Sequence, residues 1–325
     1  MNFTKIKLNA KQYIIDHPRW FFILKIWRNI LLPVFRYLRY LWQQFLGIFL
    51  ETDIFYTPTI KNTFRDQLNI TIRYRAAAFN LAFTENEKKL LALHNIHQGK
   101  RAFLVGNGPS LNDCDLSLLK DEITIGVNAI YLNKQGFHPK YYIVEDIAVA
   151  SDRYKEICAY DKPDFKFFGN YLDRYFDGAD KTLWLNVRFN YRNSKKAFFP
   201  HFSTNAGVRV WVGGTVSYLG MQLAYYLGIK ELYLIGFNHN YIIPASIIQE
   251  GAKFTSTESD PNHFDSSYFG KGYSWHDPQV ERMENSYRKA RKYYERDGRK
   301  IYNATVGGQL EVFERVDYNT LFKGE

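Results

Sequence analysis

The chain has 325 residues, of which 46% are hydrophobic and 18% aromatic, and it carries a formal net charge of +10 at pH 7. This composition excludes a disordered protein, and the length allows one large α/β domain with extensions or two domains. The two cysteines, Cys114 and Cys158, exclude a disulfide framework and a cysteine metal quartet, and they favour a reducing compartment, which we expect to be the cytoplasm.

Residues 1–50 form a basic, aromatic arm. They hold eight Lys and Arg against one Asp, so most of the net charge lies here, and a nucleic-acid partner for the whole protein is not indicated. Basic residues interrupt every apolar run in residues 19–50, which argues against a membrane-spanning helix and a signal peptide. We expect helices, broken or kinked at Pro33, that lie on an anionic membrane surface. The alternative is packing on the catalytic domain or on a second copy of the chain.

The rest of the chain alternates between strand and helix patterns. Residues 51–98 are expected to be a helical connector, and residues 99–325 a Rossmann-like catalytic domain with a lid loop at 242–275. The predicted strands are 102–105, 123–127, 141–144, 231–235 and 300–303, with weaker candidates at 166–168 and 182–185. The predicted helices are 86–93, 112–120, 216–227 and 279–296. The alternation predicts an α/β fold with a doubly wound, mostly parallel sheet.

A glycine-rich turn, GNGPS, follows the first predicted strand. Its glycines can take positive φ and let a ligand approach the backbone, and a helix after the turn would add free N–H groups and a dipole. The pattern predicts that Gly106, Asn107, Gly108 and Ser110 bind the phosphate of a nucleotide. Because no Walker lysine follows, an ordinary turn between strand and helix is the alternative.

Polar residues also end the neighbouring strands. Asn128, the pair Glu145 and Asp146, and Asn238 all stand at predicted strand ends, and the carboxyl ends of parallel strands meet at one edge of a sheet. We therefore expect these side chains in one site. The carboxylates of Glu145 and Asp146 could bind a metal, act as a base or accept hydrogen bonds from a sugar hydroxyl, and the alternative is a helix cap.

A second glycine-containing segment precedes the helix predicted at 216–227. Gly214, Thr215 and Ser217 stand at its start, where the hydroxyl groups could donate to a phosphate or carboxylate. Their alternative role is to cap the helix. Arg209, nearby in the sequence, could pair with an anionic ligand.

One histidine has the sequence context of a general base. His276 follows the long loop and precedes a helix, and Asp277 or Asp265 could orient its ring. His263 and His239 are rival candidates for the same role.

Three segments together resemble known families: GNGPSL after a strand, Asn128 at the end of the next strand, and Gly213-Gly214-Thr215 before a helix that ends in LGIKELYLIG. They resemble the bacterial sialyltransferases of glycosyltransferase family 42. They also resemble the broader family that includes motility accessory factor glycosyltransferases and the archaeal 6-hydroxymethylpterin diphosphokinase, whose closing strand is similar to residues 301–308. The resemblance covers about residues 100–315 and implies a GT-A-like sheet.

The resemblance to the sialyltransferases implies a role for the turn and for the asparagine that ends the second strand. Asn107, Gly108, Ser110 and Asn128 would hold a cytidine monophosphate (CMP) donor. Glu145 and Asp146 stand where those enzymes carry an asparagine, so another nucleotide-activated sugar is a further option.

The same resemblance implies a metal-independent reaction without a required cofactor. His276 would remove the proton of the acceptor hydroxyl, with inversion at the anomeric carbon. Tyrosines would steady the leaving phosphate, and the nearest candidates are Tyr241, Tyr268 and Tyr273.

We therefore expect a cytoplasmic glycosyltransferase that is peripheral on the inner membrane face. It would move a sialic-acid-type sugar from a nucleotide-sugar donor onto a glycan or lipid-linked acceptor in lipopolysaccharide or capsule synthesis. One alternative is a diphosphokinase of a pterin-like alcohol, with Mg²⁺ held by Glu145 or Asp146. The other is a non-catalytic scaffold in a glycan-assembly complex.

Overall fold

The computed structural model describes residues 26–35, 37–38, 64–176, 178–188, 200–251 and 253–322. The chain divides into two compact units, Met1–Thr52 and Asp53–Glu325. In the first unit the described residues are helical, with π-type hydrogen bonding over η1 (Trp27–Leu31). Of the break or kink expected at Pro33, the break is absent, since the helix continues to Phe35. The wider π turn just before Pro33 accommodates a ring that would clash with a regular helical turn.

Most of the arm and the first part of the connector lie outside the described residues. Within the described part of the chain, no helix is both long and apolar enough to cross a membrane.

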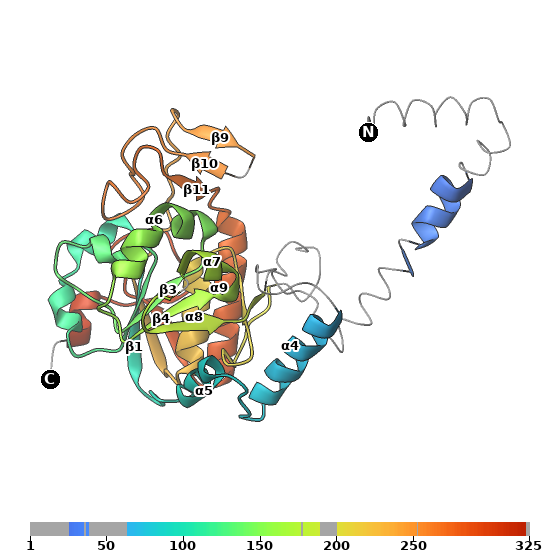
Figure 1. The fold of residues 1–325 in the computed structure, drawn as a ribbon. Helices are drawn as coiled ribbons and strands as arrows, with labels where there is room; N and C mark the ends of the chain where they lie inside the picture. The colour runs from blue at the N-terminus through green and yellow to red at the C-terminus, as the bar shows by residue number, and fades with distance from the viewer. Residues whose placement is uncertain are drawn as a thin grey trace. The chain divides into compact units, whose positions relative to one another are not determined.

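Eight strands form one sheet in the second unit, and all of its pairings are parallel (Figure 1). The spatial order is β13 (Glu314–Arg315), β12 (Lys300–Asn303), β8 (Glu231–Ile235), β1 (Arg101–Val105), β2 (Thr124–Val127), β3 (Tyr141–Val144), β4 (Phe165–Gly169) and β5 (Thr182–Leu185). The chain order reverses between β1 and β8, and such a switch point opens a crevice at the carboxyl ends of the strands. The predicted α/β fold is confirmed.

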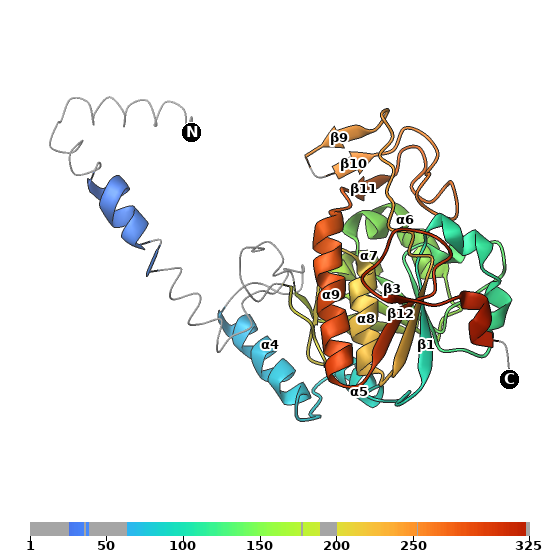
Figure 2. The same cartoon turned by 180° about the vertical axis from the view of Figure 1, so that it is seen from behind.

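Helices cover both faces of the sheet (Figures 1 and 2). They include α6 (Ile147–Ala159), α8 (Val216–Tyr226) and α9 (Val280–Arg296). The other α-helices of this unit are α4 (Phe64–Ala77), which covers neither face of the sheet, α5 (Glu85–Ala92) and α7 (Asp173–Phe176). Leu104 of β1 contacts α8 at Gly220, where an added Cβ would lie 2.7 Å from it. The preceding residue, Phe103, points to the opposite face and stacks on Phe322 of the 3-10 helix η7 (Tyr318–Phe322).

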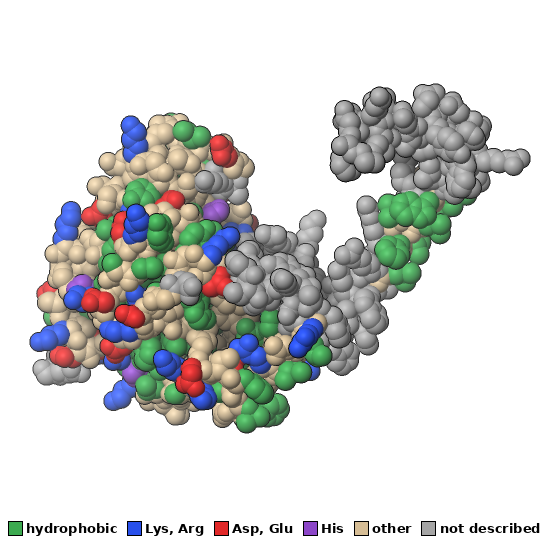
Figure 3. Space-filling view, viewed as in Figure 1, with side chains coloured by type: hydrophobic (Ala, Val, Ile, Leu, Met, Phe, Trp, Pro, Cys, Tyr) green, Lys and Arg blue, Asp and Glu red, His purple; other side chains and the backbone are tan. Residues whose placement is uncertain are grey.

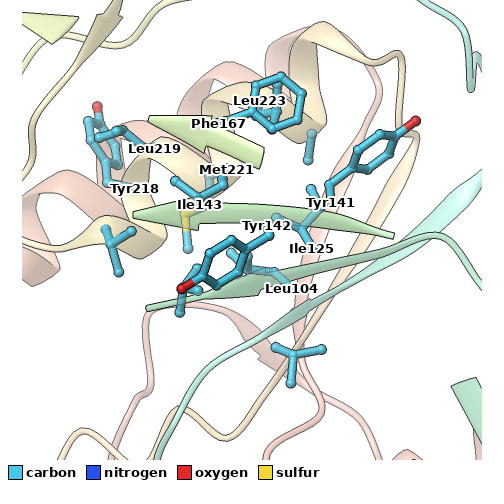
Figure 4. Packing of buried hydrophobic residues seen from close by; sticks show 14 of the residues in the cluster. Leu104, Ile125, Tyr141, Tyr142, Ile143, Phe167, Tyr218, Leu219, Met221 and Leu223 are labelled. Carbon is cyan, nitrogen blue, oxygen red and sulfur yellow. The ribbon is translucent and has the colours of Figure 1, made fainter. Parts of the chain in front are cut away.

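The centre of the core lies between α8 and the middle strands (Figure 4). Every residue of α8 is buried, which explains why its sequence is apolar around the whole helix. The labelled sheet and helix side chains of Figure 4 that meet there are Leu104, Ile125, Ile143, Phe167, Leu219, Met221 and Leu223. The helix ends at Gly228, whose φ of +90° is the left-handed conformation expected after a helix.

Two segments differ from the sequence-based expectation. Residues 112–120 form no α-helix but parts of two 3-10 helices, η2 (Pro109–Asp113) and η3 (Leu116–Leu119). The lid segment carries a small antiparallel sheet of three-residue strands: β9 (Ile248–Glu250), β10 (Lys253–Thr255) and β11 (Ser274–His276). Strands this short leave no readable alternation in the sequence.

The remaining short elements are connectors. β6 (Val187–Arg188) pairs in parallel with β7 (Val210–Trp211) in a separate two-stranded sheet. The 3-10 helices η4 (Ile130–Leu132) and η5 (Asn170–Leu172) lie shortly after the ends of β2 and β4.

Candidate functional site

A cavity opens at the carboxyl ends of β1, β2 and β8, next to the switch point of the sheet. The predicted site residues that line it are Gly106, Asn107, Gly108, Asn128, Thr215, Asn238 and Tyr241. The lid and α9 contribute further lining residues, including His263, Tyr268 and Tyr287. None of the described lining residues is Lys, Arg, Asp or Glu. The cavity is therefore polar but uncharged, with amides, hydroxyl groups and histidines.

Three N–H groups of the turn after β1, those of Gly106, Gly108 and Ser110, are bonded within the protein, where the sequence predicts free groups. Gly106 and Gly108 donate to consecutive carbonyl groups at the end of β8, each at 2.8 Å. Ser110 donates from its N–H and its Oγ to Oδ1 of Asn238, at 3.1 and 2.7 Å. Because η2 is a 3-10 helix of five residues, a helix dipole is also missing at this turn. The turn thus bonds to the end of β8.

The two glycines of this turn are needed for packing. Neither Gly106 nor Gly108 has a positive φ, contrary to expectation. A Cβ on Gly108 would lie 2.2 Å from Oδ1 of Asn238, and one on Gly106 would lie 2.7 Å from the carbonyl oxygen of Gly236. The missing side chains therefore let the segment after β8 approach β1.

Asn107 and Asn128 present two hydrogen-bond acceptors without a partner. Nδ2 of Asn107 donates to the carbonyl of Val127 at 3.0 Å and to the hydroxyl of Tyr268 at 3.1 Å. A carbonyl can only accept, so this contact fixes the amide orientation. Asn107 is 8% exposed, and its Oδ1, like that of Asn128, is buried without a partner among the described residues. A buried unpaired acceptor costs about 1–3 kcal/mol, which a ligand with N–H or O–H donors would recover.

The start of α8 forms the opposite wall. Thr215 caps the helix, since its side chain accepts from the N–H of Ser217 at 3.3 Å, and both residues line the cavity. Burial raises the pKa of Tyr287 to about 12, and its hydroxyl lies beside those of Thr215 and Ser217. A helix of eleven residues with hydroxyl groups at its N-terminus is where this cavity would stabilise an anion such as a phosphate.

Gly214 precedes this helix and does not line the cavity. Its φ of +85° requires glycine, and an added Cβ would lie 2.6 Å from Nε of Arg282. Arg282 therefore lies directly behind the start of α8.

A histidine–aspartate pair faces the cavity from the lid. Nδ1 of His263 lies 2.6 Å from Oδ2 of Asp260, and the His263 ring stacks on Tyr268 with the centroids 3.9 Å apart. Asp260 also accepts from the N–H groups of Asn262 and Phe269, at 2.8 and 3.0 Å. Burial alone would raise the pKa of Asp260, but the His263 contact and these N–H groups hold it below its ordinary value. An ionised Asp260 directs the Nδ1 proton toward itself and leaves Nε2 of His263 able to accept a proton.

Arg153 of α6 fixes the lid next to this pair. Its side chain is 4% exposed and donates to the carbonyls of Ser267 and Tyr268, both at 2.7 Å. The guanidinium also lies 4.4 Å from the ring centroid of Tyr273. Tyr273, expected to steady a phosphate, thus packs against a cation outside the cavity lining. Arg153 therefore fixes the backbone of Tyr268, on whose ring His263 stacks.

His276, the expected base, lies in a second cluster. Its Nδ1 is 3.3 Å from Oδ2 of Asp146, and its side chain is 54% exposed. The bonded carboxylate is thus Asp146, in place of the expected Asp277 or Asp265. Asp146 also caps α6 through the N–H of Ala148 at 2.6 Å. Asp265 instead accepts from the N–H and hydroxyl of a nearby serine, at 2.9 and 2.5 Å. Asp277 is half-buried beside His276 in the chain.

The pKa of Glu145, in this second cluster, lies above its ordinary value. Burial, together with the neighbouring carboxylate of Asp146, raises the pKa of Glu145 to about 8, while the charges of His276 and Arg282 act in the opposite direction. A protonated Glu145 at neutral pH is a potential proton donor. The cluster borders the cavity, since Arg282 contacts Gly214, the residue before Thr215.

His239, the other rival base, is buried in the cavity wall. Its φ is +55°, and Nε2 lies 3.5 Å from Oε1 of Glu284. Burial lowers the pKa of His239, and Glu284 only partly offsets this effect. Arg209 does not line the cavity and lies over Trp211.

The sequence did not single out Asp260, Arg153 or Tyr287. The spacing of Asp260 and His263 in Asp-Pro-Asn-His could have indicated the pair, because a turn brings residues three apart together. No comparable signal marks Arg153 or Tyr287, which reach the site from helices far away in the sequence.

No group of three or more His, Cys, Asp or Glu side chains among the described residues is arranged to hold a metal ion. Glu145 and Asp146 could supply carboxylate ligands for a Mg²⁺ whose remaining ligands are water and phosphate.

Comparison with known proteins yields one family. A family model described as 6-hydroxymethylpterin diphosphokinase MptE-like matches residues 76–243, which is just over half of the chain and includes β1 to α8 and β8. No curated protein and no solved structure matches.

Proposed function

The chain belongs to the 6-hydroxymethylpterin diphosphokinase MptE-like family, and from this premise we propose that it is a glycosyltransferase. It would move a sugar, of the sialic-acid type from a CMP donor, onto a hydroxyl group of a glycan or lipid-linked acceptor. The family supports an enzyme or an enzyme-like scaffold, and the choice of reaction depends on the cavity.

The observation that carries the proposal is an uncharged cavity next to an oriented histidine. The lining offers unpaired amide acceptors on Asn107 and Asn128, hydroxyl groups at the start of α8 and no described Lys or Arg. A triphosphate with about four negative charges would need cations here. A nucleoside monophosphate sugar carries much less charge and brings amino and hydroxyl donors for the two asparagines. This comparison favours the sugar donor.

The proposed reaction is a displacement at the anomeric carbon. His263 accepts the proton of the acceptor hydroxyl on Nε2, while the hydroxyl oxygen forms a bond to the anomeric carbon and the bond from this carbon to the phosphate oxygen breaks. Asp260 stabilises the resulting imidazolium. The start of α8 and the hydroxyl of Tyr287 stabilise the leaving phosphate.

His276, which contacts Asp146, is the competing candidate for the base. The resemblance to the sialyltransferases implies this role for His276. The two assignments predict opposite results for His263→Gln and His276→Gln. If His263 is the base, His263→Gln lowers the turnover by about 10²–10⁴-fold and His276→Gln by less than tenfold. The reverse order would assign the base to His276.

A screen for nucleotide binding tests the proposed donor. The melting temperature of the full chain is measured with CMP, UDP, GDP, ADP and ATP, each with Mg²⁺ and with a chelator. A ligand at about 100 times its Kd stabilises the fold by about 2.7 kcal/mol, which is several degrees for a domain of this size. We expect CMP to raise the melting temperature even in the presence of the chelator. A response to none of the nucleotides would contradict the proposal.

The diphosphokinase is the second candidate, since the family carries that description and Glu145 and Asp146 provide adjacent carboxylates. A diphosphokinase would show a higher melting temperature only with ATP and Mg²⁺ in the same screen, and it would lose activity when a chelator is added. A scaffold without catalytic function predicts that neither histidine variant changes the biological role.

We also propose that the arm of residues 1–50 holds the enzyme on an anionic membrane surface in the cytoplasm. The described part of the arm exposes large apolar side chains, among them Trp27, Ile30 and Phe35 (Figure 3). Flotation with vesicles that contain anionic lipid tests this role. We expect the full chain to float and a chain without residues 1–50 to float less, and equal flotation of both would contradict the proposal.

A further inference from the structure

Two isoleucines stand exposed immediately after the cavity wall. Ile242 and Ile243 are 57% and 50% exposed, and the residue before them, Tyr241, lines the cavity. Ile248, a few residues further along the lid, is 53% exposed. We call these three isoleucines the apolar rim. Apolar surface of this kind beside a polar cavity is characteristic of ligand recognition.

Ile242 of the apolar rim is connected through Asn262 to the same carboxylate as His263. Asn262 accepts from the N–H of Ile242 at 2.7 Å on Oδ1 and donates from Nδ2 to its carbonyl at 2.8 Å. The N–H of Asn262 in turn bonds to Oδ1 of Asp260 at 2.8 Å. Oδ2 of Asp260 contacts Nδ1 of His263. The backbone that presents Ile242 is thus held in a defined position relative to the proposed base.

We propose that the apolar rim binds an alkyl chain of the acceptor, and this inference rests on the proposed transferase function. The chain would lie on Ile242 and Ile243 while its hydroxyl-bearing head group reaches the cavity past Tyr241. The acceptor class is therefore an amphiphile with a neutral hydrocarbon part.

The size and charge of the surface distinguish an alkyl chain from two other possible occupants, a protein partner and an anionic lipid bilayer. Three half-exposed isoleucines present on the order of 300 Å², well below the roughly 800 Å² that each partner buries in a stable protein interface. The exposed charges on the lid are of both signs and include Glu250, Glu258 and Lys271, so the lid does not present the basic surface that attracts an anionic bilayer. An alkyl chain needs neither a larger surface nor a basic one.

The experiment follows the isoleucine methyl groups of the full 38.4 kDa chain by NMR. The probes are n-octyl and methyl β-D-glucopyranoside, both below the micelle concentration of the octyl compound, and Ile→Val variants assign the signals. We expect the octyl compound to shift the methyl signals of Ile242 and Ile243 and the methyl compound to leave them unchanged.

A double variant and a matched control complete the test. Ile242→Ser with Ile243→Ser should weaken octyl glucoside binding by at least about tenfold, because the contact loses most of its apolar area. Ile96→Ser is the control, since Ile96 is 52% exposed and lies before the amino end of β1. It should leave binding unchanged. Equal melting temperatures of all forms show that the variants fold.

Three outcomes would overturn the inference. These are no shift with the octyl compound, shifts that map to other isoleucines, or a shift that appears only with phosphatidylcholine vesicles, which would make the bilayer the occupant. Failure of the transferase proposal is separate, because the nucleotide screen reports it without an alkyl compound. If CMP raises the melting temperature and octyl glucoside shifts no methyl signal, only the alkyl-chain inference is overturned. If octyl glucoside shifts the signals and no nucleotide raises the melting temperature, the transferase proposal is overturned and an alkyl-binding site remains.

Discussion

Replacing Glu145 by glutamine should stabilise the protein at alkaline pH and not at acidic pH. Glutamine keeps the shape of a protonated glutamate and removes the ionisation that burial disfavours. The raised pKa of about 8 means that the folded state retains a proton which the unfolded chain loses near 4.5. The contribution of Glu145 is thus fully present below about pH 4.5, and it is lost as the pH rises toward 8.

The size of the effect follows from this difference in pKa. Each unit corresponds to about 1.4 kcal/mol, so the interval from 4.5 to about 8 gives an upper value of about 5 kcal/mol. Glu145 is only half-buried, and solvent screening reduces the expected gain to roughly 2 kcal/mol.

The gain in the free energy of unfolding is measured by urea unfolding of the wild type and of Glu145→Gln, near pH 5 and near pH 8.5. The free energies of unfolding should agree within about 0.5 kcal/mol at the lower pH, and the variant should be more stable by about 2 kcal/mol at the higher pH. Glu250→Gln is the control, because Glu250 is fully on the surface, and it should show no such divergence. A Glu145 variant that is less stable near pH 8.5 would refute the reasoning, since Glu145 would then be ionised and stabilised by His276 and Arg282.

Three further substitutions test other contacts. Asp260→Asn removes the carboxylate that orients His263, and we expect steady-state kinetics to show turnover lower by about 10²–10⁴-fold with donor affinity within about twofold. Gly108→Ala places a Cβ 2.2 Å from Oδ1 of Asn238, which should cost about 1–3 kcal/mol in urea unfolding. Arg153→Met leaves two lid carbonyls without their donor, and we expect a loss of about 2–4 kcal/mol and faster amide exchange in residues 260–273.

Each of these substitutions has a matched control. Asp265→Asn alters a lid carboxylate that contacts no histidine in the described residues, Gly270→Ala adds a Cβ no closer than 3.4 Å to its neighbours, and Arg174→Met removes an exposed arginine. A control that behaves like its test variant would contradict the corresponding role. Wild-type turnover in Asp260→Asn would remove His263 as the base.

The sheet could be predicted from the sequence because its strands are short apolar runs that end in glycine or a polar residue. Strands β3, β8 and β12 begin and end at the predicted residues. The α8 helix could be predicted equally well, because an apolar run lies between Thr215 and Gly228. Local composition decides these elements, since burial on both faces of a parallel sheet leaves few polar positions.

The candidate site was most directly predictable where it coincides with strand ends and with the start of α8, which Thr215 marks in the sequence. Asn107 lies two residues after the end of β1 and Asn128 directly after β2, so the topology places them together. The partner of His263 and the anchor of the lid depend on side chains that meet across long distances in the chain, such as Arg153 with Tyr268. The sequence does not reveal that Gly106 and Gly108 also make room for the segment after β8. Their approach to a ligand stays a prediction.

The pairing of β1 with β8 has a consequence for synthesis on the ribosome. Arg101 pairs with Glu231, 130 residues later in the chain. At 5–20 residues per second, β1 emerges roughly 6–26 s before β8 is available. One edge of β1 therefore stays unpaired during that interval, and its free N–H and C=O groups beside apolar side chains are a target for chaperones and for misassociation. Slowing translation after β2 should accordingly increase aggregation of the nascent chain, whereas slowing it after β12 should not.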